Sequence, residues 1–229
     1  MISGESIRKE LFLCKDEEYA KFQRKLIPTI DPESIIGVRT PKLRTIAKRM
    51  KEEEGVEKFL EDLPHLYFEE NLLHGFIIAE IKDMDLCVKH VDKYLPYVNN
   101  WAGCDQLNPH IFKENKEKLL GKIPLWISEK NVYNVRFGVK MLMDHFLEEK
   151  FSQEYLTWVA EIQREEYYIK MMAAWYFATA LAKQYDLTLP YIKEKKLNSW
   201  IHNKTIQKAI ESRRLSLEQK QELKQYRKN

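Results

Sequence analysis

The sequence predicts an all-α protein made of stacked helices. Apolar residues recur at helical spacing along nearly the whole chain of 229 residues, in segments rich in Lys, Glu and Leu. Only 7 glycines and 8 prolines punctuate it, too few for the tight turns of a many-stranded β protein. Because the links between segments are short, we expect neighbouring helices to form antiparallel pairs.

Several predicted helices carry start or stop signals. Ser3 opens the first, Pro28 ends the second, and Thr40 caps the third with Pro41 at its first position. The predicted segments are, in order, 3–15, 16–28, 40–53, 55–64, 68–82, 84–98, 99–107, 110–128, 130–150, 152–163, 165–185, 188–197, 203–214 and 216–228.

Three of these segments give definite expectations about burial. Segment 16–28 places Tyr19, Phe22 and Leu26 on one apolar stripe. Segment 68–82 is apolar enough to be buried, and segment 130–150 carries a long stripe that includes Val135 and Leu142.

Composition limits the classes of protein and of partner. The net charge of +3 does not by itself diagnose nucleic-acid binding, so a basic face would have to come from clustering. The three cysteines are far apart and form no CxxC, which favours a reduced, cytoplasmic chain without a structural zinc. No apolar run is long enough for a signal peptide or a membrane span, and a monomer is the default expectation.

Spacing in the middle of the chain suggests a repeat. Asp105 and Arg136 are 31 residues apart, and Arg136 and Trp175 are 39 apart, close to one two-helix repeat of HEAT type. We therefore expect one domain, residues 1–229, folded as a superhelical solenoid whose concave face brings such residues together. An irregular helical bundle is the alternative.

The stretch "NNWAGCDQL" is the strongest candidate for chemistry. Trp101 and Asp105 are four residues apart, so they would share one face of a helix capped by Asn99 or Asn100. An indole beside a carboxylate attracts a cation. The alternatives are a buried core tryptophan and an aspartate that caps a helix beginning after it.

Two later helices each carry one unusual side chain. Arg136 lies at the border of an apolar stripe, and Trp175 lies in a helix that is apolar nearly all round. A solvated arginine and a core tryptophan are the alternative interpretations. Brought together at repeat spacing, a carboxylate, two indoles and a guanidinium would suit a cation flanked by a phosphate.

Basic side chains gather in three places where a nucleic-acid backbone could be contacted, although a solvated surface is the alternative for each. These residues are Arg39, Lys42, Arg44, Lys48 and Arg49; Lys170; and Lys204, Lys208, Arg213 and Arg214. Other chemistry is weakly indicated. The six histidines show no metal-ligand spacing, and Cys104 has only His110 as a possible partner for nucleophilic catalysis.

The sequence resembles the DNA alkylation repair family of HEAT-like-repeat alkylpurine DNA glycosylases. "GVRTPKLR", "NNWAGCD", the Arg136 helix, the Trp175 helix and "ESRRLS" carry this resemblance in the expected order over about residues 5–220.

The resemblance implies a solenoid whose concave face holds duplex DNA. It implies hydrolysis of the N-glycosidic bond of cationic N3- and N7-alkylated purines, without metal or cofactor, and in the best-studied type without flipping the lesion into a pocket. By resemblance, Asp105 would be the catalytic carboxylate and Trp101 and Trp175 the aromatic walls. Arg136 would hold the backbone.

Two positions depart from the family's usual pattern. Asn100 stands where active members often carry a second aromatic residue, and Ala178 stands where a basic residue is expected. Some branches of the family have little or no glycosylase activity. A non-catalytic binder of damaged or branched DNA and a protein-binding HEAT scaffold therefore remain as alternatives.

Overall fold

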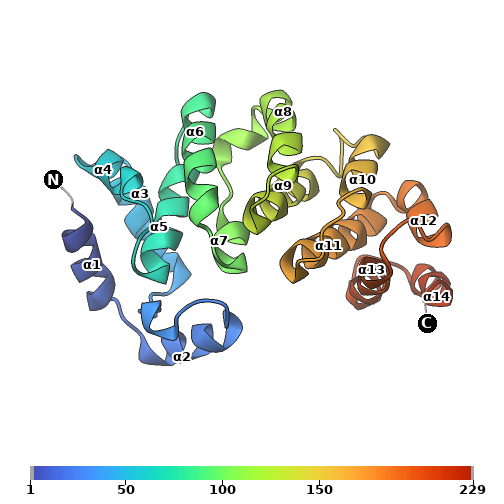
Figure 1. Cartoon of the computed structure of the whole chain (residues 1–229), viewed down its shortest axis with the longest axis horizontal. Coiled ribbons are helices and arrows are strands. Elements are labelled where there is room, and N and C mark those ends of the chain that lie inside the picture. The colour runs from blue at the N-terminus through green and yellow to red at the C-terminus, as the bar shows by residue number, and fades with distance from the viewer. Residues whose placement is uncertain (1–2, 228–229) are drawn as a thin grey trace. The chain divides into compact units, whose positions relative to one another are not determined.

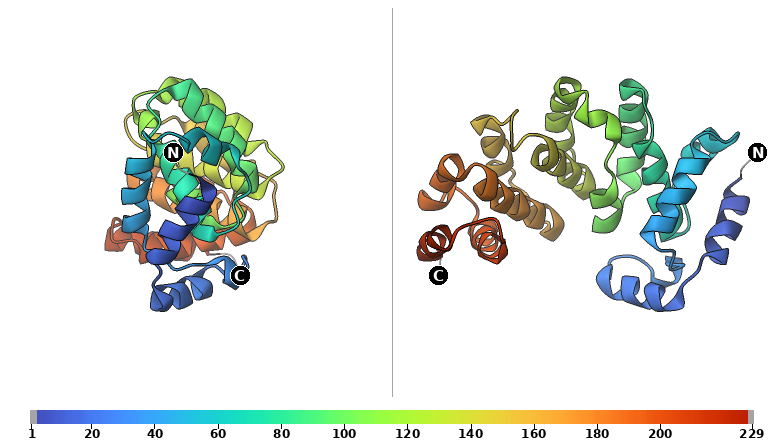
Figure 2. Two further views of the ribbon diagram at one scale, coloured as in Figure 1. Left: turned by 90° about the vertical axis from the view of Figure 1, so that its left-hand side faces the viewer. Right: turned by 180° about the vertical axis from the view of Figure 1, so that it is seen from behind.

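The structure, a computed structural model, describes residues 3–227, and these residues form helices and connecting loops without a strand (Figures 1 and 2). Lys228, at the end of the last predicted segment, lies outside the described residues. The α-helices are α1 Gly4–Leu13, α2 Glu17–Leu26, α3 Thr40–Met50, α4 Val56–Glu61, α5 Phe68–Ala79, α6 Met84–Tyr94, α7 Trp101–Gln106, α8 Lys116–Ile127, α9 Val132–His145, α10 Gln153–Ala160, α11 Tyr167–Lys183, α12 Tyr185–Lys193, α13 Ser199–Glu211 and α14 Leu217–Gln225. Short 3-10 helices cover Pro32–Ser34 (η1), Leu95–Tyr97 (η2) and His110–Lys113 (η3). The all-α prediction is confirmed.

The chain divides into two compact units, residues 1–115 and residues 116–229. In the first, α5 packs between α3 and α7 and also contacts α1 and α6. All residues of α5 except Asn71 are buried, as its apolar sequence predicts.

The second unit has a simple internal arrangement. Helices α9, α11 and α13 pack side by side in that order, as Figure 1 shows in olive, orange and red. Helix α8 packs on α9, α10 and α12 pack on α11, and α14 packs on α13. The unit thus consists of helices paired with a neighbour, whereas the superhelix and its concave face remain predictions.

Most helix ends lie where the sequence places them. Ser3 caps α1 through a reciprocal pair of hydrogen bonds with Ser6. Helix α2 ends at Leu26, before Pro28. The third helix differs by one residue, because Thr40 is its first residue and Arg39 occupies the capping position without a side-chain bond.

The apolar stripe predicted on α2 is wrong. Phe22 is 54% exposed and Leu26 41% exposed, and Ala20 is the buried residue of this helix. Gly37 decides the orientation: an added Cβ at this glycine would lie only 2.8 Å from the Ala20 Cβ. Since Ala20 and Phe22 point to nearly opposite sides of a helix, close packing at Gly37 turns Phe22 outward.

Several other segment boundaries differ from the prediction. Segment 84–98 is divided into α6 and η2, α9 ends at His145, and α12 covers Tyr185–Lys193 where 188–197 was predicted. Segment 110–128 is divided into η3 and α8. Helix α13 begins at Ser199, earlier than predicted, because Asn198 accepts a hydrogen bond from the Trp200 backbone N–H at 2.9 Å. Within residues 3–227, no helix combines the length and the apolar character that crossing a membrane requires.

Candidate functional site

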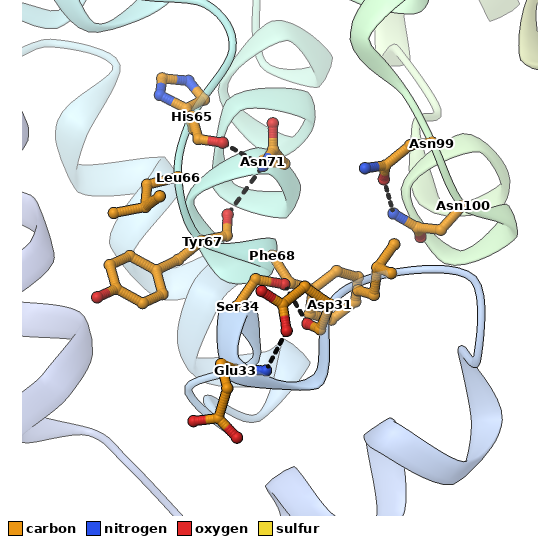
Figure 3. Close-up of a pocket in the computed structure, with 11 residues that line it drawn as sticks. Asp31, Glu33, Ser34, His65, Leu66, Tyr67, Phe68, Asn71, Asn99 and Asn100 are labelled. Atoms are coloured by element: carbon orange, nitrogen blue, oxygen red, sulfur yellow. Dashed lines mark hydrogen bonds between the residues drawn. The ribbon is translucent and has the colours of Figure 1, made fainter.

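Asn100 fixes the start of α7, the helix of "NNWAGCDQL". Its Oδ1 accepts from the Gly103 backbone N–H at 2.9 Å. Its Nδ2 donates to Asn99 Oδ1 at 2.9 Å, as Figure 3 shows. The predicted cap is therefore Asn100. Asn100 is 4% exposed and its amide is used within the protein, so this position supplies no aromatic face to a ligand.

Trp101 and Asp105 both lie within α7, and both are partly exposed. Four residues separate them, which places them about one helical turn apart on the same side. The Trp101 indole Nε1 donates to the Leu26 carbonyl oxygen at 3.3 Å, which orients the ring. Two alternatives are wrong: Asp105 does not cap a later helix, and Trp101 is not a core residue.

A polar pocket of about 360 Å³ lies beside the start of α7. Asn99 and Asn100 form one side of it, and Asp31, Glu33 and Asn71 lie around the remainder (Figure 3). The Asn71 amide donates to the carbonyl oxygens of His65 and Tyr67, at 3.2 and 2.9 Å. With carboxylates in its wall and no lysine or arginine, this pocket repels phosphate and suits neutral or cationic groups.

The motif "GVRTPKLR" is held in place by a buried carboxylate from α5. Glu69 is fully buried and accepts from three consecutive backbone N–H groups, those of Ile36 at 2.9 Å, Gly37 at 2.7 Å and Val38 at 3.2 Å. Burial raises the pKa of the Glu69 carboxyl, although the three N–H groups oppose this shift. The carboxylate thereby fixes the segment that leads into α3.

The basic residues of this motif differ in how they are held. Arg39 forms an ion pair with Asp16, with its Nη2 at 2.7 Å from Oδ2, and its guanidinium lies 5.0 Å from the centre of the Tyr19 ring. The Arg44 guanidinium lies 4.2 Å from the centre of the Phe76 ring, and Lys42 is exposed. All three are available at the surface around the start of α3. Arg49 in turn pairs with Glu10 and Glu53.

Arg136 is not a solvated border residue. It is 4% exposed on α9, and its Nη1 donates to the Tyr168 carbonyl oxygen at 2.8 Å, in the first turn of α11. A buried guanidinium needs such acceptors, because desolvation of an unpaired charge is costly. Its position between two helices fixes it far more firmly than a surface arginine.

One turn further along α9 lies a second buried cation, which was not among the residues expected from the sequence. Lys140 is 5% exposed, and its Nζ lies 2.6 Å from Asp144 Oδ2. Lys140 follows Arg136 by four residues, so the two cations share one side of the helix. The signal was the interruption of the apolar stripe by charges at positions 136, 140 and 144.

Trp175 on α11 is 40% exposed, so the core interpretation is wrong. The next position on the accessible side of the helix is Thr179, whose hydroxyl donates to the Trp175 carbonyl oxygen at 2.9 Å. Ala178 is buried, which explains the absence of a basic side chain at that position.

The remaining predicted residues occupy the second unit. Lys170 lies in the first turn of α11 and Lys204 in α13, and both ammonium groups lie near the ring of Trp200. Arg213 and Arg214 are exposed and follow the end of α13. Trp200 was missed, because a lone tryptophan near a helix start carries no distinctive sequence signal.

A Cys104–His110 nucleophile is not supported. Cys104 is fully buried. The His110 side chain is 67% exposed, with its Nε2 3.6 Å from Glu80 Oε1. An inaccessible thiol cannot attack a substrate.

The sequence matches the family of DNA alkylation repair enzymes over residues 7–214, which is most of the chain. This chain belongs to that family. A comparison with curated proteins found no match.

The family match includes every residue singled out above from Trp101 to Arg214. Within one unit, the structure brings Trp101 close to Asp105. Within the other, it links Arg136 to the first turn of α11 and places Lys170 and Lys204 at one ring. Arg213 and Arg214 lie apart from these contacts in the chain, after α13.

Proposed function

We propose that this protein is a DNA glycosylase that hydrolyses the N-glycosidic bond of cationic alkylated purines in duplex DNA, such as N3-methyladenine and N7-methylguanine. Membership of the DNA alkylation repair enzymes supports a DNA substrate with alkylation damage. The observation that carries the catalytic part is the pairing of a carboxylate, Asp105, with an indole, Trp101, one turn apart on a capped helix.

The chemistry fits a carboxylate as the main catalytic group. An alkylated purine already carries positive charge, so it leaves with the bonding electron pair and becomes neutral without a general acid. As the bond from C1′ to the base nitrogen breaks, positive charge develops on the sugar, and the Asp105 carboxylate stabilises it. A water oxygen then bonds to C1′, and its proton passes to Asp105 or to solvent.

The other site residues have supporting roles in this proposal. The indole faces of Trp101 and Trp175 contact the deoxyribose and add cation–π stabilisation, about 0.5–2 kcal/mol each. Arg136 binds the phosphate backbone beside the lesion. A HEAT-like solenoid with a concave DNA-binding face is part of the proposal, and the row of α9, α11 and α13 supports it.

One observation favours a second candidate, a family member that binds damaged DNA without cleaving it. The side chain of Asn100 is used to cap α7, so the site lacks an aromatic group at this position. A weaker aromatic enclosure would stabilise the sugar cation less. The two candidates share DNA binding and differ only in whether base is released.

The test is release of N7-methylguanine and N3-methyladenine from methylated duplex DNA, corrected for spontaneous depurination. The wild type is compared with Asp105→Asn and with Glu114→Gln, which changes an exposed carboxyl in the same unit. We expect release by the wild type and by Glu114→Gln, and a loss of about 100-fold or more in Asp105→Asn.

DNA binding measured on the same samples separates the candidates. If the wild type binds DNA but releases no more base than the no-enzyme control, the non-catalytic candidate replaces the glycosylase. If Asp105→Asn releases base at the wild-type rate, Asp105 is not the catalytic carboxylate.

A further inference from the structure

The polar pocket beside the start of α7 has a volume of about 360 Å³, which is room for one small planar molecule. Its polar wall comes from three segments, with Asn71 on α5, Asn99 before α7 and Asp31 before η1 (Figure 3). Apolar side chains line it as well, those of Ile30, Leu66 and Phe68. An apolar surface with a few polar groups is the usual composition of a small-molecule site.

Hydrogen bonds fix which atom each asparagine presents. Because Asn100 Oδ1 accepts from the Gly103 backbone N–H, its Nδ2 faces Asn99, which meets it with Oδ1. The Asn99 Nδ2 is then a donor without a partner among residues 3–227. The Asn71 Nδ2 donates to two carbonyl oxygens, so its Oδ1 is the atom left over as an acceptor.

Asp31 adds a carboxylate to the pocket. Its Oδ1 accepts from the Glu33 backbone N–H at 2.9 Å, which orients the group, and its Oδ2 has no such partner in the described part of the chain. The Glu33 side chain is exposed and points away from Asn71 and Asn99 in Figure 3. Since no lysine or arginine is among the described residues that line the pocket, no cation of its wall neutralises Asp31.

These acceptors and the one donor match the Watson–Crick edge of guanine. Guanine carries two neighbouring N–H donors, N1 and the N2 amine, beside the O6 acceptor, whereas adenine carries one amine beside a ring-nitrogen acceptor. A carboxylate accepts readily from the guanine donors, and an amide N–H donates to O6. Alkylation at N7 leaves this edge intact and adds positive charge, which a carboxylate attracts.

We infer that this pocket binds an unstacked N7-alkylguanine base by its Watson–Crick edge. Asp31 and Asn71 accept from the N1 and N2 hydrogens, and Asn99 Nδ2 donates to O6. The inference rests on the proposed glycosylase function and deepens it, because it makes N7-alkylguanine the preferred lesion over N3-alkyladenine. A damaged base costs less to unstack than a normal one, which favours its transfer into a pocket.

The test is the binding of soluble nucleosides to the wild-type protein, followed by NMR titration. 7-Methylguanosine carries the full edge and the charge, 7-methylinosine lacks only the N2 amine, and adenosine presents the other edge. We expect 7-methylguanosine to bind about 10-fold more tightly than 7-methylinosine, because the missing amine leaves an acceptor unpaired. Adenosine should bind more weakly still.

Two substitutions of equal shape test the contacts. Asp31→Asn keeps the oxygen that accepts from Glu33, and Asn99→Asp keeps the oxygen that accepts from Asn100. Each should weaken 7-methylguanosine binding about 10-fold, with thermal unfolding close to that of the wild type. Asp186→Asn, at an exposed site on α12, is the matched control and should bind as the wild type does.

Three outcomes would overturn the inference. The first is equal binding of 7-methylguanosine and adenosine. The second is wild-type binding of 7-methylguanosine by both Asp31→Asn and Asn99→Asp. The third is a loss of binding in Trp101→Ala but not in Asp31→Asn, because the base would then lie on the indole face and not in the pocket.

Base release from methylated DNA decides the proposed function separately. Release of N7-methylguanine by a protein that binds no 7-methylguanosine would remove the pocket from the account and leave the glycosylase. Selective binding of 7-methylguanosine without release of any base would remove the glycosylase and leave a guanine-base site. If both hold, Asp31→Asn should lower the release of N7-methylguanine relative to N3-methyladenine about 10-fold.

Discussion

The two units hold their candidate site residues in different ways. In residues 1–115, buried side chains fix the backbone by hydrogen bonds. The Glu69 carboxylate binds the segment before α3, and Asn100 caps α7. In residues 116–229, the candidates lie on long, largely buried helices. Arg136 and Trp175 are on α9 and α11, which pack directly against each other. The candidate residues of the first unit are thus positioned mainly by individual hydrogen bonds, and those of the second by helix packing together with the Arg136 bond to Tyr168.

This difference predicts which substitutions matter in each unit. In the first unit, replacing one hydrogen-bonding atom of Glu69 or Asn100 should lower the free energy of unfolding, because an unsatisfied buried polar group costs about 1–3 kcal/mol. An added methyl group should also be costly wherever the chain is closely packed, at the backbone contact of Gly37 in the first unit and between helices in the second.

The largest expected effect is at Gly37, in the segment that Glu69 holds. Its φ of 98° is unfavourable for any other residue, and an added Cβ would lie 2.3 Å from the Asp16 carbonyl oxygen. Gly37→Ala should lower the free energy of unfolding by about 3–5 kcal/mol, measured by urea denaturation. Gly121→Ala is the control, because a Cβ there meets nothing within 4 Å. Equal stability of the two variants would contradict the account.

The next largest effect on stability is expected at Glu69, the carboxylate that binds this segment. Glu69→Gln keeps the shape but turns an amide N–H toward one of the three backbone donors that the carboxylate serves. We expect a loss of about 2–3 kcal/mol in the free energy of unfolding, together with weaker DNA binding through displaced Arg39. Glu52→Gln, at an exposed position, should change neither. A Glu69→Gln variant as stable as the wild type would show that the segment does not need the carboxylate.

A third prediction concerns pH and a histidine pair in the first unit. His65 Nε2 lies 2.8 Å from His74 Nδ1. Burial lowers the pKa of His65 to about 4 and that of His74 well below its usual value. The unfolded chain therefore binds protons that the folded chain does not, and stability should fall as pH decreases from about 6.5 to about 4.

The size of this loss is on the order of 1–3 kcal/mol, measured as the change in unfolding free energy with pH. Replacing both histidines with Gln should reduce the dependence of the unfolding free energy on pH. His110→Gln, at an exposed site, should leave this dependence unchanged. A pH dependence that survives the double substitution would assign it to other groups.

The smallest effect is expected in the second unit, where α8 packs on α9. A Cβ added at Gly138 would lie 2.8 Å from Ile127 Cγ1 and 3.2 Å from Trp126 Cβ. Gly138→Ala should cost about 1–2 kcal/mol, because overpacking outweighs the gain in helix propensity. A stabilised variant would mean that the two helices move apart easily and that packing is not what holds this unit.

The sequence predicted the helices well, because helical periodicity and capping residues are local signals. Ser3 and Asn100 are examples in which a short polar side chain caps the helix and so marks where it begins. The stripe on α2 failed, since the contact that orients this helix joins Ala20 to Gly37 across 17 residues. No local pattern reports such a contact.

Candidate site residues were identified from the sequence where the residue type was unusual for its setting. Asp105 and Arg136 were identified as charges on apolar helices. Glu69 and Trp200 were missed, because a glutamate in the first turn of a helix and a tryptophan near a helix start are both ordinary in sequence. Their partners, three backbone N–H groups and two lysines, are apparent only in three dimensions.

The most direct test of the account is single-turnover base release from a duplex with one N7-methylguanine, measured over a range of enzyme concentrations. This experiment separates the rate constant of bond cleavage from the affinity for DNA. The account predicts that Asp105→Asn lowers the rate constant by about 100-fold or more with nearly unchanged affinity. Asp105→Asn with an unchanged rate constant and weaker affinity would contradict it, because the carboxylate would then serve binding and not catalysis.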